Sequence, residues 1–149
     1  MAGRTVLQST RTGAAELLDV VSLVTQAVWT DLRQSGAAIE ATQWTTLRML
    51  AAAPCTMSEL ARHKAVTLPT ISRSVDMLVR RGWVERCVDE SDRRQTLVRL
   101  TPAGQRLLAD CRRRFEDLIA AKLAGLSDDQ RARLTTSLLA VGAALRTKE

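Results

Sequence analysis

The chain of 149 residues has few of the residue types that form disulfides and metal sites. Its three cysteines, Cys55, Cys87 and Cys111, are widely separated and contain no CxxC pair, which disfavours structural disulfides and a zinc site. His63 is the only histidine, and no further ligand stands at metal spacing from it. We therefore expect no bound metal and interpret His63 as a polar helix residue.

The sequence also lacks the signatures of enzymes and of membrane proteins. It contains no GxSxG, no P-loop, no HExxH and no acid-base pair with a plausible cleft partner, so we expect no catalytic residues, no cofactor and no enzymatic activity. No apolar run approaches the roughly 18 residues of a membrane span, and the first residues lack the apolar core of a signal peptide. A cytoplasmic protein without membrane contact is expected.

The composition favours one folded domain over residues 1–149 with an anionic partner. Hydrophobic residues make up 46% of the chain, which is typical of a globular protein. The net charge is +6, and residues 62–99 hold nine Lys or Arg against five Asp or Glu, so +4 of it lies in that segment. Such a basic segment fits nucleic acid or an anionic membrane surface, although a solvated surface explains the composition equally well.

Two helices are predicted before the basic segment. Apolar residues recur at helical spacing over residues 14–32, at Leu17, Val20, Val21, Val24, Val28 and Leu32, and Gly36 ends this pattern. A second helix is predicted over residues 41–52, with Trp44, Leu47 and Leu50 on one face and the sequence AAPC at its end.

Two shorter helices follow. Thr56 and Glu59 stand at capping-box spacing and predict a third helix that runs to about Lys64. Thr67 is a plausible N-cap for a fourth helix, which has Pro69 in its first turn and ends at Gly82. Its predicted buried face consists of Leu68, Ile71, Val75 and Leu78.

The apolar period then changes from 3.6 to 2. Residues 83–88 and 96–100 read as two strands of a hairpin with a long, charged tip. Thr101 and Pro102 begin a fifth helix, whose apolar side includes Cys111 as a core residue. Ser127 and Gln130 form a second capping box that starts a last helix, which extends through Leu145.

Two helices joined by a short turn and followed by a hairpin make a winged helix-turn-helix. If Ile71, Val75 and Leu78 pack inward, helical geometry turns an outward set of mostly polar side chains to solvent, namely Pro69, Thr70, Ser72, Arg73, Asp76 and Arg80. A helix with this surface fits the major groove of double-stranded DNA. The alternative is a purely structural helical hairpin.

The chain resembles the MarR-type transcriptional regulators over nearly its whole length. The resemblance is carried by three segments that follow one another along the chain, SELAR, LPTISRSVDMLVRRGWVER and DRRQTLVRLTPAG. The resemblance implies a mainly α fold with a small β-hairpin wing. It further implies a winged helix-turn-helix over residues 41–100 and dimerisation helices over residues 14–35 and 101–146. It implies a homodimer whose fourth helix enters the major groove while the wing reaches the minor groove.

The same resemblance assigns DNA-binding residues. Arg94 matches the wing arginine and Asp92 the acid that orients it, and the recognition-helix positions fall on Thr67, Pro69, Thr70, Ser72 and Arg73. Arg93 is an expected phosphate contact. An arginine at a hairpin tip can enter a narrow minor groove while a neighbouring carboxylate fixes its guanidinium. The roles of Asp89 and Glu90 are left open.

One departure from the family lies in the turn of the helix-turn-helix. The family places an apolar residue and then glycine where this chain has Lys64 and Ala65. We therefore expect a tighter or reoriented turn, because alanine lacks the freedom of glycine to take a left-handed conformation.

Family resemblance also implies a small lipophilic, often anionic, effector. Trp29, Trp44, Arg48 and Met49 are the candidate pocket residues, although Trp and Met at helical spacing are more often core residues. Some relatives sense oxidants through a cysteine near the N-terminus, but here the first cysteine is Cys55. Cys87, beside Arg86, is the only cysteine whose neighbourhood favours a thiolate.

The function predicted is transcription regulation by a ligand-responsive repressor that binds a pseudo-palindromic operator as a homodimer. Two alternatives stay open: a winged-helix adaptor that binds proteins without specific DNA binding, and a cysteine-based redox regulator. The operator, the effector and the choice between repression and activation are not readable from the residues.

Overall fold

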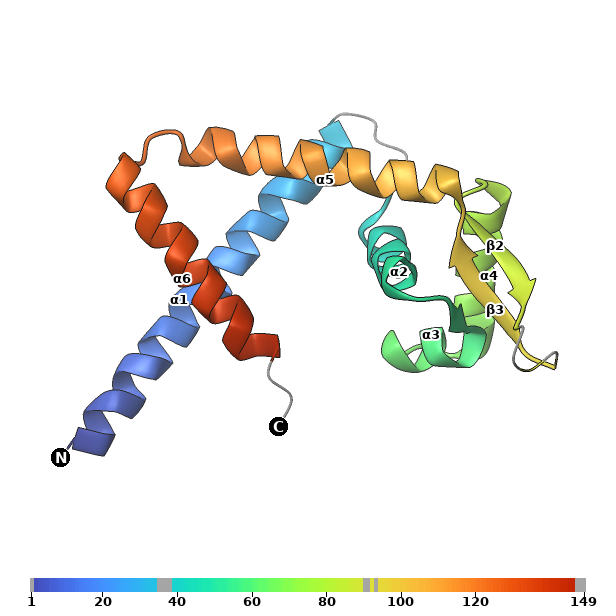
Figure 1. The fold of residues 1–149 in the computed structure, drawn as a ribbon, viewed down its shortest axis with the longest axis horizontal. Coiled ribbons are helices and arrows are strands. Elements are labelled where there is room, and N and C mark those ends of the chain that lie inside the picture. Colours follow the sequence, from blue (N-terminus) through green and yellow to red (C-terminus); the bar gives the residue numbers. More distant parts are fainter. Residues whose placement is uncertain (1, 35–38, 90–91, 93, 147–149) are drawn as a thin grey trace. The chain divides into compact units, whose positions relative to one another are not determined.

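The computed structural model describes residues 2–34, 39–89, 92 and 94–146 and is mostly helical (Figure 1). Its elements are α1 (Ala2–Gln34), α2 (Ala41–Ala52), β1 (Cys55–Thr56), α3 (Met57–His63), α4 (Leu68–Arg80), β2 (Val84–Val88), β3 (Thr96–Leu100), α5 (Pro102–Leu123) and α6 (Asp128–Arg146). The chain forms two compact units, residues 1–113 and 114–149. The predicted class, mainly α with a small hairpin, is confirmed.

The first helix is longer than its apolar pattern predicts. α1 begins at Ala2, whereas the apolar stripe starts only at Leu17. Residues 8–16 are exposed, so this part of the helix has no buried face and shows no apolar pattern from which the sequence could predict it. Gly36, the predicted break, lies outside the described residues.

The wing belongs to a three-stranded antiparallel sheet in the order β1-β3-β2. β2 and β3 form the predicted hairpin, in a register that pairs Val84 with Leu100. The pairing of Cys55 with Val98 adds β1 on the other side of β3, and the sequence reading missed this strand. A two-residue strand is too short to show alternation, and only its partner strand reveals it.

The α4 helix packs its predicted face into the core of the winged part. Ile71, Val75 and Leu78 are all buried, as is Val98 of β3. The prediction that Leu68 is buried with them is wrong, because its side chain is 51% exposed. Leu68 is the first residue of α4 and lies at the edge of the core.

The predicted helix caps are largely confirmed. The Thr56 hydroxyl accepts from the Glu59 N–H at 3.2 Å, and the Glu59 carboxylate accepts from the Thr56 N–H at 2.8 Å. The capping box of Ser127 and Gln130 also forms. Thr67 occupies the N-cap of α4, but its hydroxyl meets that of Thr70 instead of a backbone N–H. Local hydroxyl and carboxylate spacing therefore predicted where the helices begin.

Two further observations concern Cys111 and the apolar character of the helices. Cys111 is buried, which confirms its prediction as a core residue. Within the described residues, no helix combines the length and the apolar character needed to cross a membrane.

Candidate nucleic-acid interface

The turn between α3 and α4 takes a conformation that usually requires glycine. Ala65 has φ of +51°, in the left-handed region, where a Cβ atom is strained. The turn is closed by two backbone hydrogen bonds, from the Ala65 N–H to the Arg62 carbonyl and from the Val66 N–H to the Ala61 carbonyl. The expected reorientation is therefore absent at Ala65, which adopts a left-handed conformation despite its side chain.

Lys64 anchors this turn to α2. Its ammonium donates to the Thr42 carbonyl oxygen at 2.8 Å, to Thr45 Oγ1 at 2.9 Å and to Thr46 Oγ1 at 2.8 Å. Three acceptors match the three N–H donors of an ammonium group. Burial lowers the pKa of Lys64 from its usual value. A lysine at this position therefore holds the helix-turn-helix to α2 and is not available to a phosphate.

The exposed side of α4 carries cations without a partner. Arg73 and Arg80 are exposed and, within the described residues, have no side-chain hydrogen bond or ion pair. Of the other predicted recognition residues, Thr67, Pro69 and Thr70 are exposed and Ser72 is half-buried. Asp76 is engaged, because its carboxylate accepts from Arg86 of β2 at 2.7 Å. This pair removes a negative charge from the side of α4 that is expected to meet DNA.

The tip of the wing is organised by Asp92. One carboxylate oxygen accepts from the backbone N–H of Arg94 at 3.0 Å, and the other accepts from Gln95 Nε2 at 3.0 Å. The Gln95 N–H donates to the Asp92 carbonyl, and the Asp89 N–H donates to the Gln95 carbonyl. Asp92 therefore holds the backbone at Arg94, whereas we expected it to hold the guanidinium.

The Arg94 side chain is left exposed by this arrangement. Within the described residues its guanidinium has no hydrogen bond or ion pair, so it is available to a partner. The predictions for Arg93 and Glu90 fall outside the described residues. Asp89 is half-buried, and its N–H closes the base of the tip.

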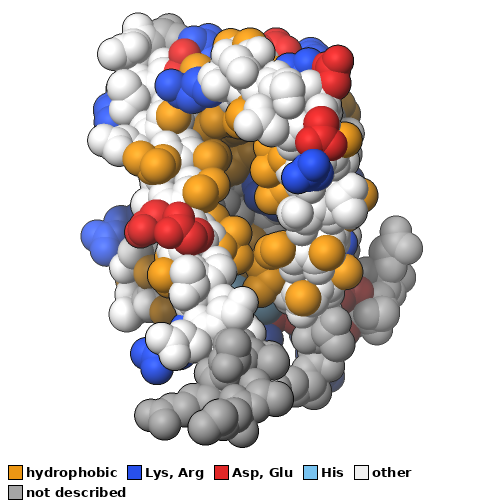
Figure 2. Space-filling view, turned by 90° about the vertical axis from the view of Figure 1, so that its left-hand side faces the viewer, with side chains coloured by type: hydrophobic (Ala, Val, Ile, Leu, Met, Phe, Trp, Pro, Cys, Tyr) orange, Lys and Arg blue, Asp and Glu red, His pale blue; other side chains and the backbone are white. Residues whose placement is uncertain are grey.

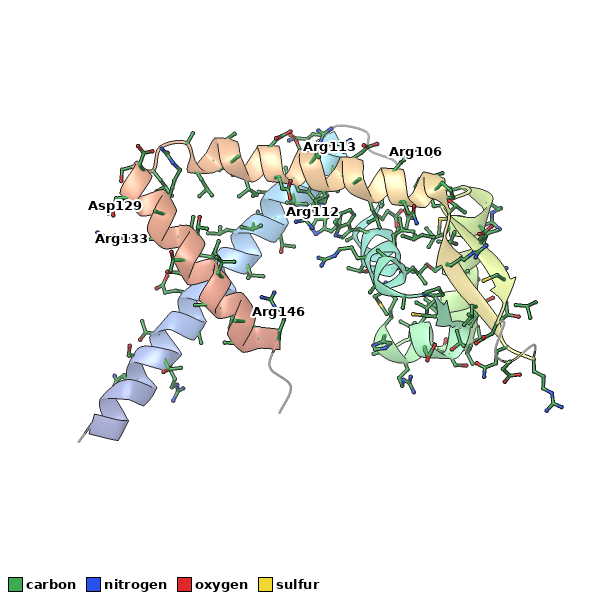
Figure 3. The ribbon with its side chains drawn as sticks, viewed as in Figure 1. Arg106, Arg112, Arg113, Asp129, Arg133 and Arg146 are labelled. Carbon is green, nitrogen blue, oxygen red and sulfur yellow. The ribbon has the colours of Figure 1, made fainter. Side chains whose placement is uncertain are left out.

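Several arginines of the long helices and of the hairpin are paired with acids. Figure 3 shows Arg113 on α5 and Arg133 on α6, and each pairs with an acid on its own helix, Arg113 with Asp110 and Arg133 with Asp129. On the hairpin, Arg99 pairs with Glu85 across the strands at 2.7 Å. Arg73, Arg80 and Arg94 differ from these paired arginines, although Arg106 of α5 is also exposed and has no hydrogen bond or ion pair in the described part of the chain.

The sequence reading missed a polar contact behind α4, between the buried Gln43 and the exposed Arg81. Gln43 of α2 is buried, and its Oε1 accepts from Arg81 Nη1 at 3.2 Å. Arg81 follows the last turn of α4 and lies over the ring of Trp83, 4.9 Å from the ring centroid. A glutamine within an apolar helical pattern is a weak signal, and only the packing of α2 against α4 identifies its partner.

Two of the cavities that the described residues form lie in the unit of residues 1–113. One of about 280 Å³ is lined by Trp29, Leu32, Arg33, Ile39, Glu40 and Ala41. It includes Trp29 from the predicted pocket residues but not Trp44, Arg48 or Met49. A second cavity of about 500 Å³ lies beside the C-terminal end of α2 and is lined mainly by apolar residues, among them Leu50, Leu100 and Leu108.

The described cysteines offer little support for redox chemistry. Burial, and secondarily the charge of Glu59, raises the pKa of the Cys55 thiol. Cys111 is buried, and the guanidinium of Arg86, next to Cys87, is bound to Asp76. Nor does any group of three or more His, Cys, Asp or Glu in the described part of the chain form a candidate metal site.

Known proteins with a similar sequence or structure share this architecture. The MarR family pattern matches residues 39–95. The multiple antibiotic resistance protein MarR of Salmonella typhimurium is 36% identical over 98 residues, which cover 64% of this chain and 68% of that protein.

Solved structures extend the similarity over most of the chain. Wild-type MarR from E. coli in its apo form is 30% identical, with a TM-score of 0.64 over 84% of this chain and 96% of that one. A cysteine-to-serine mutant of E. coli MarR complexed with operator DNA is 32% identical, with a TM-score of 0.56 over 85% of this chain and 93% of that one. The chain therefore belongs to the MarR family of transcriptional regulators.

Proposed function

We propose that this protein is a sequence-specific DNA-binding repressor that binds a pseudo-palindromic operator as a homodimer. The observation that carries the proposal is the set of unpaired, exposed guanidinium groups on α4 and at the wing tip, from Arg73, Arg80 and Arg94. Arginines without protein partners can contact phosphates and base edges at no cost in broken ion pairs. Thr67, Pro69, Thr70 and Ser72 would accompany Arg73 in the major groove. Arg94 would enter the minor groove, positioned by Asp92, and Arg93 would contact a phosphate.

The exposed apolar residues of the long helices support a dimer. On α1, Leu18 and Leu23 are 68% and 65% exposed, and on α6 Leu139 and Leu145 are 66% and 75% exposed. Figure 2 shows many hydrophobic side chains at the surface of the face that it draws. Large exposed apolar patches mark association sites. A two-fold dimer would place two recognition helices about 34 Å apart, the distance between successive turns of the major groove.

The proposal extends to an effector and a location. A small lipophilic or anionic molecule would bind in the cavity that contains Trp29 and Arg33, where an aromatic ring and a guanidinium stand together. The protein would act in the cytoplasm, without membrane contact and without catalysis of its own. Binding of the effector would weaken DNA binding and so relieve repression.

Selection from a random duplex library tests DNA reading directly. We expect the full-length protein to enrich a pseudo-palindrome with half-sites one helical turn apart, and the affinity to fall steeply with salt. Sedimentation of the protein with and without the enriched duplex measures the oligomeric state. An unenriched library would reject the proposal.

The protein-protein adaptor is the second candidate, because Leu68 and Val88 leave apolar side chains exposed on α4 and on the wing. An adaptor would use these residues against a partner protein. Replacing Val88 by Thr separates the two functions, since it would leave operator affinity unchanged if DNA is the partner.

A further inference from the structure

Gln43 is a buried polar residue whose partners come from two helices. Its side chain is 1% exposed. Its Oε1 accepts from the Glu40 N–H at 3.2 Å, in the capping box that starts α2, and from Arg81 Nη1 at 3.2 Å. Its Nε2 lies 3.4 Å from the Met77 sulfur, which accepts from it. One amide therefore joins the first turn of α2 to the end of α4.

Arg81 extends this joint to the wing. Its backbone N–H caps α4 by donating to the Met77 carbonyl, and its guanidinium lies over the Trp83 ring. Trp83 in turn donates its N–H to the Leu78 carbonyl and accepts from the Thr101 N–H. The joint thus connects α2, the end of α4, and the point where the first wing strand begins.

Apart from the Asp76–Arg86 pair, which links α4 to β2, the remaining packing of α4 is apolar and has no comparable direction. Ile71, Val75 and Leu78 bury apolar surface, and the hydrophobic effect that favours this burial is non-directional. A hydrogen bond weakens steeply when its angle or length changes. Gln43 therefore supplies the directional contacts of α4 toward α2, as Asp76 does toward β2, and these contacts restrict the rotation and depth of α4.

We propose that Gln43 is a positioning residue for DNA reading, acting through Arg81 and Met77 to hold α4 in the orientation that its outward side chains need. The inference rests on the proposed DNA-binding function. Base contacts require their side chains to be placed within about 0.5 Å, whereas contacts to phosphates tolerate more displacement. Loss of the joint should thus reduce discrimination between the operator and other sequences more than it reduces the affinity for DNA in general.

Three variants test this role. Gln43→Met keeps the length of the side chain but removes its hydrogen-bond acceptor and its donor. Gln43→Glu keeps the acceptor for both the Glu40 N–H and Arg81, as glutamate serves equally well in a capping box. Arg81→Met removes the other half of the joint while leaving an apolar stem over Trp83.

We expect Gln43→Met and Arg81→Met each to weaken binding to the selected operator about tenfold, the effect of one lost hydrogen bond to a charged group. Both should bind a duplex without the operator as wild type does, and the double variant should be no worse than either single one. Gln43→Glu should restore operator binding. Each affinity is measured well below the thermal midpoint of that variant, so that only folded protein is compared.

Amide hydrogen exchange over residues 77–81 gives a readout independent of DNA. It should accelerate in Gln43→Met and stay at the wild-type rate in Gln43→Glu. Wild-type operator affinity in Gln43→Met, equal losses on both duplexes, or unchanged exchange would each overturn the inference. If the wild-type protein selects no operator, the proposed function fails, and the exchange rates alone then decide whether Gln43 holds α4.

Discussion

The carboxylate of Asp92 binds the backbone N–H of Arg94, at 3.0 Å, and not its guanidinium. The acid thereby shapes the loop that presents the arginine and leaves the cation exposed for a partner. Asp92 thus supports the loop and Arg94 is available for the contact, so the two positions have different chemical requirements. This division of roles makes distinct predictions for the two residues.

Replacing Arg94 by Ala should weaken operator binding by about 10- to 100-fold, as expected for one arginine in a DNA groove. The thermal midpoint should stay unchanged, because the side chain has no partner in the described part of the protein. Equilibrium binding at several salt concentrations measures the effect. Arg106→Ala, which removes an exposed cation from α5 (Figure 3), is the matched control and should bind as wild type does.

Replacing Asp92 by Ala should weaken binding less than Arg94→Ala, because it loosens the loop without removing the cation. Asp92→Asn retains an oxygen that can accept from the Arg94 N–H and should preserve most of the affinity. In the double variant with Arg94→Ala, the Asp92 substitution should add no further loss. Additive losses would show that Asp92 acts independently of Arg94.

Ala65→Gly should stabilise the protein by about 1 kcal/mol, because it relieves the strain of a left-handed alanine. This corresponds to a rise of about 2–4 °C in the thermal midpoint of a chain of this size. Gly82, with φ of +70° and no atom close to an added Cβ, provides the mirror experiment. Gly82→Ala should lower the midpoint by a similar amount, and a fall with Ala65→Gly would contradict the argument.

Gly104→Ala should destabilise the protein by about 1–3 kcal/mol, the range for overpacked sites. A Cβ atom there would lie 2.0 Å from the Trp83 carbonyl oxygen, which is backbone and cannot rotate away. Chemical denaturation measures the loss. Gly13→Ala, in the middle of α1 with no atom within 4 Å of the new Cβ, should instead stabilise slightly.

Acid should weaken the start of α3. Hydrogen bonds from the Thr56 N–H and hydroxyl lower the pKa of Glu59 below its usual value of 4.5. Because the folded-state pKa lies below the unfolded one, this contribution to stability is complete above pH 4.5 and is lost as the pH falls through the folded-state pKa. Glu59→Gln keeps the capping box without the titration. Its free energy of unfolding should thus fall less between pH 5 and about pH 3 than that of wild type, and parallel curves would refute the assignment.

Local signals in the chain were sufficient for the starts of α3, α4, α5 and α6 and for the hairpin, but not for the start of α1. Thr56 with Glu59, and Ser127 with Gln130, form their boxes from residues three apart, and the change of period to 2 marks β2 and β3. These features depend on contacts within a few residues, so no distant partner needs to be known. The resemblance to the MarR family likewise rests on contiguous segments of the sequence, over α4 and the wing.

Contacts between distant segments decided the rest. β1 exists only because Cys55 pairs with Val98, and Lys64 binds residues of α2 that lie 18 to 22 positions earlier in the chain. Gln43 finds Arg81 across thirty-eight positions. Sequence periodicity does not predict such pairings. Each polar side chain could form hydrogen bonds with many others, and packing decides which of them comes within hydrogen-bond distance.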